Sequence, residues 1–409
     1  MSESSPDLPA EVRAAVADPT SWGPDTVAVR GGINRSAFDE TSELLVLTSG
    51  FVYDSAEQAE AAFAGHNDHY VYSRATNPTL TMLQERLRLL EGAEACRVTA
   101  SGMAAVHASL AAIVAAGDRI VAARGLFARC HQVLDVVLRR FGVDTVFVDG
   151  SDLDAWAQAL SEPTAAVFFE TPSNPMQELV DIAAVSELAH AAGAVVVVDN
   201  VFATPQFQRP LELGADVVVY SLTKHVDGQG RVLGGAILGA RDYIADQVQP
   251  LMGQIGPTMS AFNAWVLLKG LETLRLRVTH QAASALELAS WLQDRPGVNW
   301  VLYPMLDSHP QHELAQRQMG AGGTVVTFEV NGGRERAFDV VNGLGLFDIS
   351  NNLGDAKSLV THPATSTHQR IGPDLRRSMG ITDGVIRLSI GLEDVADLRA
   401  DLAQALSTG

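Results

Sequence analysis

The stretch AVVVVDNVFATPQFQRPLELGADVVVYS, residues 194–221, contains two short apolar runs, at 195–198 and 217–220. Neither run alternates with polar residues, as a strand with one face in water would. Continuous apolar strands are typical of a parallel sheet that helices cover on both faces. The stretch therefore predicts two central strands of a doubly wound α/β fold.

The same rhythm extends to both sides of this stretch. Further apolar runs alternate with helical patterns such as GMAAVHASLAAIVAA; these runs are RIVAA (119–123), DTVFV (144–148), AAVFFE (165–170) and GGAILG (234–239). We predict one large α/β domain over residues 71–255, preceded by an irregular, partly helical arm over residues 1–70. Residues 256–409 are expected to form a long bridging helix within 260–293 and a smaller α+β domain, with strands near TVVTFEV (324–330) and VIRLSIGL (385–392).

The composition narrows the class of protein. The net charge of −19 over 409 residues opposes binding to nucleic acid or to an anionic membrane, and the sequence shows no basic patch. It also lacks a run of about 18 apolar residues and a signal-peptide pattern, so we expect a cytoplasmic protein. Cys96 and Cys130 form neither a disulfide framework nor a metal-binding spacing, so we expect two reduced, buried thiols and no metal site.

Lys224 is the first candidate for catalysis. The chain has only three lysines, and Lys224 alone follows a predicted strand end, in DVVVYSLTKHVDGQGRVLGG (216–235). Open α/β sheets bind ligands at that edge, where a partly buried, deprotonated lysine can form an imine with an aldehyde cofactor. Asp199 ends the preceding strand and could pair with the protonated nitrogen of a pyridine ring. Taken singly, each residue could equally be a surface lysine or a turn-capping aspartate.

A phosphate site is predicted near the same edge. The segment TASGMAAVHASL (99–110) begins a helix at Ser101, Gly102 and Met103, where free backbone N–H groups favour an anion. Ser221 and Thr223 could add hydroxyl donors. A helix capped by serine is the ordinary alternative.

The chain order of this cradle, the aspartate and the lysine resembles that of the fold-type-I pyridoxal-phosphate enzymes. Within that group, residues 40–408 resemble the Cys/Met-metabolism family. The stretches that carry the resemblance are HYVYSRATNPTLTMLQERLRLLEG (69–92), FFETPSNP (168–175), VVVDNVFATP (196–205), SNNLGDAKSL (350–359), THPAT (361–365) and RLSIGLED (387–394). The resemblance implies pyridoxal 5'-phosphate bound to Lys224, a mainly parallel large sheet and a smaller α+β domain.

The resemblance also implies roles for further residues. Tyr72 and Arg74 would reach the cofactor phosphate of a neighbouring subunit, in a homotetramer built as a dimer of dimers. Phe127 would stack on the cofactor ring. Asn174, Asn352 and Arg387 would bind the substrate, Asn174 also lying beside the cofactor.

Two departures from relatives bear on the reaction. Many relatives carry tyrosine where Phe127 stands, and Arg129 occupies the position of the reactive cysteine of the γ-lyases, which disfavours lyase activity. Phe127, FVDG (147–150), HVDGQGRVLGGAILG (225–239) and SNNLGDAKSLVTHPAT (350–365) most resemble the branch of this family that uses sulfide. That resemblance implies a γ-replacement in methionine biosynthesis, in which sulfide displaces succinate from O-succinylhomoserine to give homocysteine.

Several alternatives stay open. Cysteine could replace sulfide, as in cystathionine γ-synthesis, or the ester could be O-acetylhomoserine. A non-catalytic scaffold would be expected to have lost Lys224, Asp199, Arg74 or Arg387, all of which are present. A fold-type-I aminotransferase would keep the γ-substituent, and TKHVDGQGRVLGG (223–235) does not resemble that branch.

Overall fold

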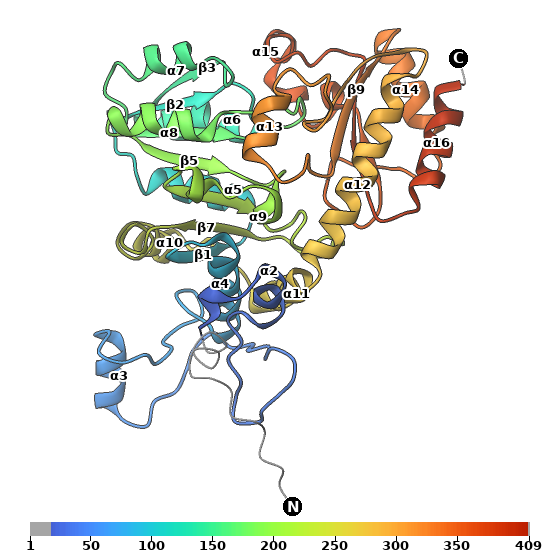
Figure 1. Ribbon diagram of the computed structural model, residues 1–409. Coiled ribbons are helices and arrows are strands. Elements are labelled where there is room, and N and C mark those ends of the chain that lie inside the picture. Colours follow the sequence, from blue (N-terminus) through green and yellow to red (C-terminus); the bar gives the residue numbers. More distant parts are fainter. Residues whose placement is uncertain (1–17, 408–409) are drawn as a thin grey trace, which may run out of the picture.

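The computed structural model describes residues 18–407, so the first 17 residues of the predicted arm lie outside the described residues. Figure 1 shows two lobes, each built around its own sheet, with the chain crossing between them along a long helix. No helix of residues 18–407 is both long and apolar enough to cross a membrane.

The large lobe contains a seven-stranded sheet in the order β1-β7-β6-β5-β4-β2-β3. Its strands are β1 (Ala95–Thr99), β2 (Arg119–Ala123), β3 (Asp144–Val148), β4 (Ala166–Glu170), β5 (Val195–Asp199), β6 (Val217–Ser221) and β7 (Gly235–Gly239). Strands β2 to β6 run parallel, and β7 is antiparallel to both β1 and β6. The predicted mainly parallel α/β fold is confirmed.

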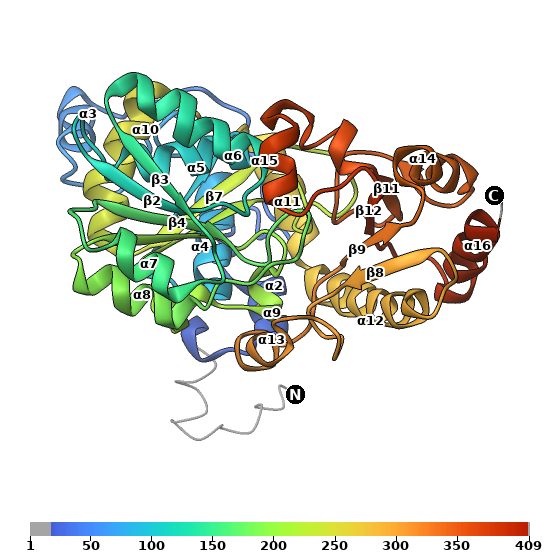
Figure 2. The same cartoon turned by 90° about the horizontal axis from the view of Figure 1, so that it is seen from above.

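Both faces of this sheet are buried. Ile120 and Ala122 of β2 pack into the core on one face, and Val121 and Ala123 pack into a separate core on the other. Figure 2 shows α7 and α8 on one side of the strands and α5, α6 and α10 on the opposite side. Because successive strand residues alternate between two apolar layers, every position favours an apolar side chain.

The helices of the large lobe connect these strands. They are α4 (Pro78–Glu91), α5 (Gly102–Ala111), α6 (Ala128–Gln132), α7 (Leu153–Ala159), α8 (Ile182–Ala191), α9 (Thr204–Phe207) and α10 (Gln249–Ile255). Helix α6 is followed by a π-helical turn (Val133–Val137) and a 3₁₀ turn (Leu138–Phe141).

The predicted bridging helix is divided into α11 (Ala261–Leu271) and α12 (Leu274–Gln293). A Cβ on Gly270 would lie 2.1 Å from the Val226 carbonyl oxygen, so glycine is needed where α11 passes this turn. The buried Arg277 side chain donates to the carbonyl oxygens of Gly270 and His225, both at 2.8 Å. Arg277 thereby adds a donor to the Gly270 carbonyl, which the Thr273 N–H reaches only at 3.4 Å, and ties the helix break to the turn after Lys224.

The small lobe has a five-stranded sheet in the order β10-β11-β12-β9-β8. The strands are β8 (Val298–Leu302), β9 (Val325–Val330), β10 (Asp348–Ile349), β11 (Leu359–Thr361) and β12 (Val385–Ser389). Its helices are α13 (His312–Gln318), α14 (Gly333–Gly343), α15 (Pro373–Ser378) and α16 (Val395–Ser407), and α12, α14 and α16 share one apolar core with the sheet.

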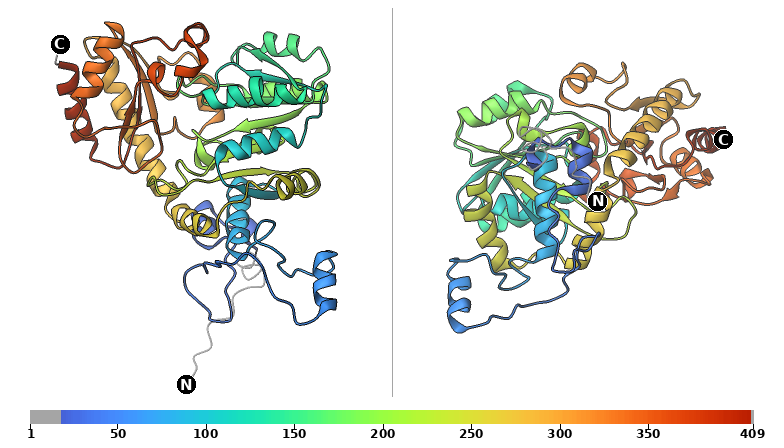
Figure 3. Two further views of the ribbon diagram at one scale, coloured as in Figure 1. Left: turned by 180° about the vertical axis from the view of Figure 1, so that it is seen from behind. Right: turned by 60° about the horizontal axis from the view of Figure 1, so that its bottom comes forward.

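The N-terminal segment, with α2 (Pro24–Arg30) and α3 (Ala56–Phe63), is fastened to the large lobe by a buried ion cluster. Arg86 of α4 is fully buried, contacts a Glu43 carboxylate oxygen at 2.5 Å and donates to the Gly31 carbonyl oxygen at 2.8 Å. Lys269 of α11 contacts the second Glu43 oxygen. Beyond this anchor, α3 and its flanking loops project away from the lobe (Figure 3).

Candidate active site

A cavity of about 510 Å³ opens at the carboxyl-terminal edge of the large sheet. Glu170, Asp199 and Ser221 end three adjacent parallel strands and all line it. The small lobe closes the far side with residues 351–353 and 366–370, of which Asn351, Leu353 and Arg370 line the cavity. This is the edge where open α/β sheets bind ligands, and it is where the sequence places the site.

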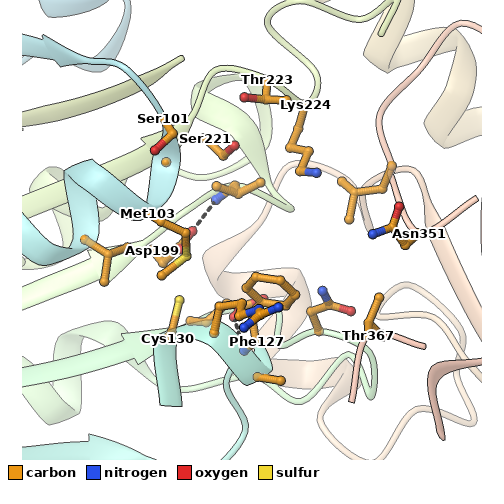
Figure 4. A pocket seen from close by; sticks show the side chains of 18 of the residues that line it. Ser101, Met103, Phe127, Cys130, Asp199, Ser221, Thr223, Lys224, Asn351 and Thr367 are labelled. Carbon is orange, nitrogen blue, oxygen red and sulfur yellow. Dashed lines mark hydrogen bonds between the residues drawn. The ribbon is translucent and has the colours of Figure 1, made fainter. Parts of the chain in front are cut away.

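Lys224 lies in the turn after β6 and extends toward the loop that carries Asn351 (Figure 4). Its Nζ donates to Asn352 Oδ1 at 2.5 Å. Burial, and secondarily the positive charge of Arg387, lower the pKa of Lys224 to about 8. A far larger fraction of this amine than of an ordinary lysine is therefore neutral near pH 7, and a nucleophile or base must be neutral.

Asp199 ends β5, directly beside Glu170 of β4 in the sheet register. One carboxylate oxygen accepts from the Val201 N–H at 3.1 Å, and no cation of residues 18–407 pairs with the carboxylate. Burial raises the pKa of Asp199 to about 7. A buried carboxylate of this kind is stabilised by a cationic ring nitrogen brought in by a ligand.

The first turn of α5 lies where the sequence predicts an anion cradle. Ser101 Oγ accepts from the Ala104 N–H at 3.2 Å, whereas the N–H groups of Gly102 and Met103 have no acceptor within the described chain. A Cβ on Gly102 would lie 2.6 Å from Ser221 Cβ, so only glycine lets the helix end approach this strand end. Figure 4 shows Ser101, Ser221 and Thr223 along one side of the cavity, with Phe127 on the opposite side.

The three predicted substrate-binding residues are brought together. Arg387 of β12 is buried, donates from Nη1 to Asn174 Oδ1 at 2.9 Å and from Nη2 to the Asn352 carbonyl oxygen at 3.0 Å. Its Nε has no partner within residues 18–407. Asn174 lines the cavity and Arg387 lies behind it, so a carboxylate bound here would meet the amide first and the guanidinium next.

Glu170 is a site residue that the sequence reasoning missed. Its carboxylate accepts from the Phe127 N–H at 2.8 Å and so fixes the backbone beneath the Phe127 ring. Burial, together with the neighbouring Asp199 charge, raises the pKa of Glu170 well above its usual value. Its position at the end of an apolar strand, the same signal that identified Asp199, could have revealed it.

Tyr72 and Arg74 do not line this cavity. They line a separate depression with Gly256 and Thr258, and Tyr72 is 46% exposed. The Arg74 guanidinium lies 5.5 Å from the centre of the Tyr72 ring. Within one chain, therefore, these two predicted phosphate ligands stay apart from Lys224.

Cys96 and Cys130 are both free and buried, as predicted. Burial raises the pKa of both thiols, which keeps them protonated. Although Cys130 lines the cavity, it is therefore a poor nucleophile or base there.

This arrangement of a depressed-pKa lysine, an unpaired buried carboxylate and a helix N-terminus on a doubly wound fold defines the class of fold-type-I pyridoxal-phosphate enzymes. The chain belongs to the family of Cys/Met metabolism PLP-dependent enzymes, whose model matches residues 25–407. The family predicted from the sequence is thus confirmed.

Individual relatives cover nearly the whole chain. An O-succinylhomoserine sulfhydrylase of Mycobacterium tuberculosis is 63% identical over 97% of this chain and 98% of its own length. One from Pseudomonas aeruginosa is 47% identical over 94% of this chain and 95% of its own. A solved structure described as a putative O-acetylhomoserine (thiol)-lyase from Campylobacter jejuni with a pyridoxyl-lysine is 31% identical, covers 95% of this chain and 100% of that one, and superposes with a TM-score of 0.90.

The residues present fit pyridoxal 5'-phosphate. Asp199 offers an uncompensated carboxylate for the ring nitrogen, and the cradle at Gly102 and Met103 offers unpaired N–H groups for the phosphate. Lys224 supplies an amine whose pKa is lowered to about 8, and Phe127 supplies an apolar ring on the cavity wall.

Proposed function

We propose that this chain catalyses the replacement of the succinyl group of O-succinylhomoserine by sulfide, giving homocysteine and succinate in methionine biosynthesis. The Cγ–O bond of the substrate breaks and a Cγ–S bond forms. Relatives named for this activity are 63% and 47% identical to the chain. The observation that carries the proposal is the Lys224 amine, which has a lowered pKa and shares its cavity with Asp199.

Pyridoxal 5'-phosphate, when bound, supplies an electron sink for negative charge at the substrate α-carbon. Asp199 would pair with the protonated ring nitrogen of that cofactor and so favour its electron-accepting form. Arg387 and Asn174 bind the α-carboxylate of the substrate, which fixes the direction of the Cα–H bond. The Lys224 amine removes the Cα proton, and the Asn352 amide oxygen, 2.5 Å from Nζ, orients the amine.

Lys224 is also the group best suited to move the later protons. Phe127 has no hydroxyl, and the Cys130 thiol stays protonated because its pKa is raised by burial. Glu170 is engaged by the Phe127 N–H, and Asp199 by its role at the ring. We therefore assign to Lys224 the proton transfers at Cα and Cβ that accompany loss of succinate and addition of sulfide.

A competition assay tests the proposal. The purified holoenzyme is given O-succinylhomoserine and O-acetylhomoserine in equal amounts, with sulfide or cysteine, and the products are identified by mass spectrometry. We expect homocysteine and succinate as the main products with sulfide. Cystathionine as the preferred product, or 2-oxobutyrate formed from the ester without any thiol product, would contradict the proposal.

We further propose that the enzyme acts in the cytoplasm as a homotetramer, a dimer of dimers in which the arm and large domain of one subunit serve the next. The exposure of Tyr72 and its separation from the Lys224 cavity support an intersubunit role. Mixing inactive Lys224→Ala and Arg74→Ala subunits should restore about one quarter of the sites, because half of the mixed dimers' sites are intact. No restoration after demonstrated subunit exchange would contradict the shared site.

A further inference from the structure

Two arginines line the cavity beside the predicted stacking ring. Arg129 lies in the first turn of α6, two residues after Phe127, and Arg370 lies in the short 3₁₀ helix Gln369–Ile371, two residues after His368. The Phe127 and His368 rings meet edge to face with centroids 6.5 Å apart. This contact brings the two arginine-bearing segments, about 240 residues apart in the sequence, to the same wall of the cavity.

Neither arginine has an acidic partner within the described chain. Arg129 donates only to Gln132 Oε1, at 3.0 Å, and the Arg370 guanidinium has no polar partner within residues 18–407. Both side chains are exposed, as is Arg139, which by contrast pairs with the Asp135 carboxylate at 2.9 Å. In a chain with 48 acidic and 29 basic residues, two unneutralised guanidinium groups on one cavity wall indicate a site for an anion.

The substrate of the proposed reaction has two carboxylates. Arg387 and Asn174 account for the α-carboxylate, which leaves the distal carboxylate of the succinyl group without a partner. Glu170 and Asp199 also line the cavity. They would repel the distal carboxylate when ionised and would not pair with its charge when protonated. An acetyl ester ends in a methyl group and would gain nothing from a cation.

We propose that Arg129 and Arg370 form a second carboxylate subsite, which binds the far end of a dicarboxylate-derived ester and selects succinyl over acetyl substrates. The inference rests on the proposed function and names its acyl specificity. Arginine suits this role because its planar fork binds a carboxylate through two parallel hydrogen bonds. Both arginines line the same cavity as Lys224, so one bound ester could contact the amine and the subsite together.

Arginine-to-glutamine variants test the subsite in the holoenzyme. For Arg129→Gln and Arg370→Gln, we expect kcat/KM for O-succinylhomoserine with sulfide to fall about 10-fold each, and about 100-fold for the double variant. For O-acetylhomoserine the change should stay within about 3-fold, since that ester lacks the distal charge. Arg140→Gln is the matched control: it removes an exposed arginine just beyond α6 that does not line the cavity, and should change neither value.

Equal losses with both esters, or no loss with either, would overturn the subsite while leaving γ-replacement by the wild type in place. Calorimetric titration of the holoenzyme with succinate and with acetate gives a readout that is independent of turnover. We expect the double variant to weaken succinate binding at least about 10-fold and to leave acetate binding unchanged. If the wild type made no homocysteine, the proposed function would fail, and unchanged succinate binding in the double variant would separately refute the subsite.

Discussion

The lowered pKa of Lys224 and the raised pKa of Lys269 predict that the Lys224 amine loses its proton at a lower pH than the Lys269 amine. At pH 7 a pKa of about 8 leaves about 9% of the amine neutral, whereas the ordinary value of 10.5 would leave about 0.03%. Lys224 should therefore hold roughly 300-fold more neutral amine at pH 7 than an ordinary lysine. Its acetylation rate in cofactor-free protein should rise about tenfold per pH unit below 8 and level off above it.

Pulse labelling with acetic anhydride from pH 6 to 11, read by peptide mass spectrometry, measures this directly because the chain has only three lysines. Lys269 is the internal control. Burial disfavours its charged form, but hydrogen bonds to Glu272 and Glu43 outweigh that effect and raise the pKa of Lys269. The reasoning would be refuted if the acetylation rate of Lys224 reached half its maximum at or above pH 10.5. It would also be refuted if Lys224 and Lys269 showed the same dependence of acetylation rate on pH.

The same assay separates the two causes of the shift. Arg387→Gln removes the nearby positive charge, so the Lys224 midpoint should rise above 8 but stay below 10.5, because burial is the larger cause. Arg140→Gln removes an arginine outside the site and should leave the midpoint in place. A fall in the midpoint after Arg387→Gln would contradict the assigned direction.

Three further substitutions test the cofactor cradle and the arm. Asp199→Asn should weaken the binding of pyridoxal phosphate, followed by absorbance during titration, and lower turnover by about 100-fold or more, because the ring nitrogen loses its charged partner; retention of full activity would argue against this role. Gly102→Ala puts a Cβ 2.6 Å from Ser221 Cβ, so cofactor affinity should fall about tenfold while the fold, followed by circular dichroism, persists. Arg86→Met should lower the free energy of unfolding in urea by about 2 kcal/mol, because it removes one of the two cations that pair with buried Glu43 and leaves only Lys269. A change under about 0.5 kcal/mol would show that the cluster does not anchor the arm.

The central sheet could be predicted because one property, burial on both faces, determines the composition of its inner strands. Strands such as Val195–Asp199 and Val217–Ser221 are buried on both faces, so the absence of alternation itself identifies them. Strand β1 (Ala95–Thr99) lacked this signal, because it lies at the sheet edge, contains Arg97 and pairs only with β7. Strand β10 has two exposed residues, which is too short for any pattern to show.

The helix break between α11 and α12 could not be predicted from periodicity. Leu271 and Leu274 continue an apolar pattern across the break, and the local sequence contains no proline. What ends α11 is tertiary: Gly270 passes against the Val226 carbonyl, and the Arg277 side chain binds the carbonyl oxygens exposed there. Interactions of this kind depend on residues about 45 positions apart, which no local rule detects.

Some residues of the candidate site could likewise be predicted from local sequence, and others could not. Lys224 and Asp199 are placed by strand ends, and the carboxyl ends of parallel strands meet at one edge. The small-lobe wall, with Asn351 and Arg370, comes from loops whose approach depends on the packing of two lobes. The position of Asn174 beside Arg387 was expected only from resemblance, since 213 residues separate them.

The most direct test of the account is the site of cofactor attachment. Cofactor-free protein is incubated with pyridoxal 5'-phosphate, the covalent link is trapped with borohydride, and the peptides are mapped by mass spectrometry. We predict one pyridoxyl group per chain, on the peptide that contains Lys224, and its absence in Lys224→Arg. A pyridoxyl group found instead on Lys269 or Lys357, or a Lys224→Arg protein that is labelled and active like the wild type, would contradict the central claim.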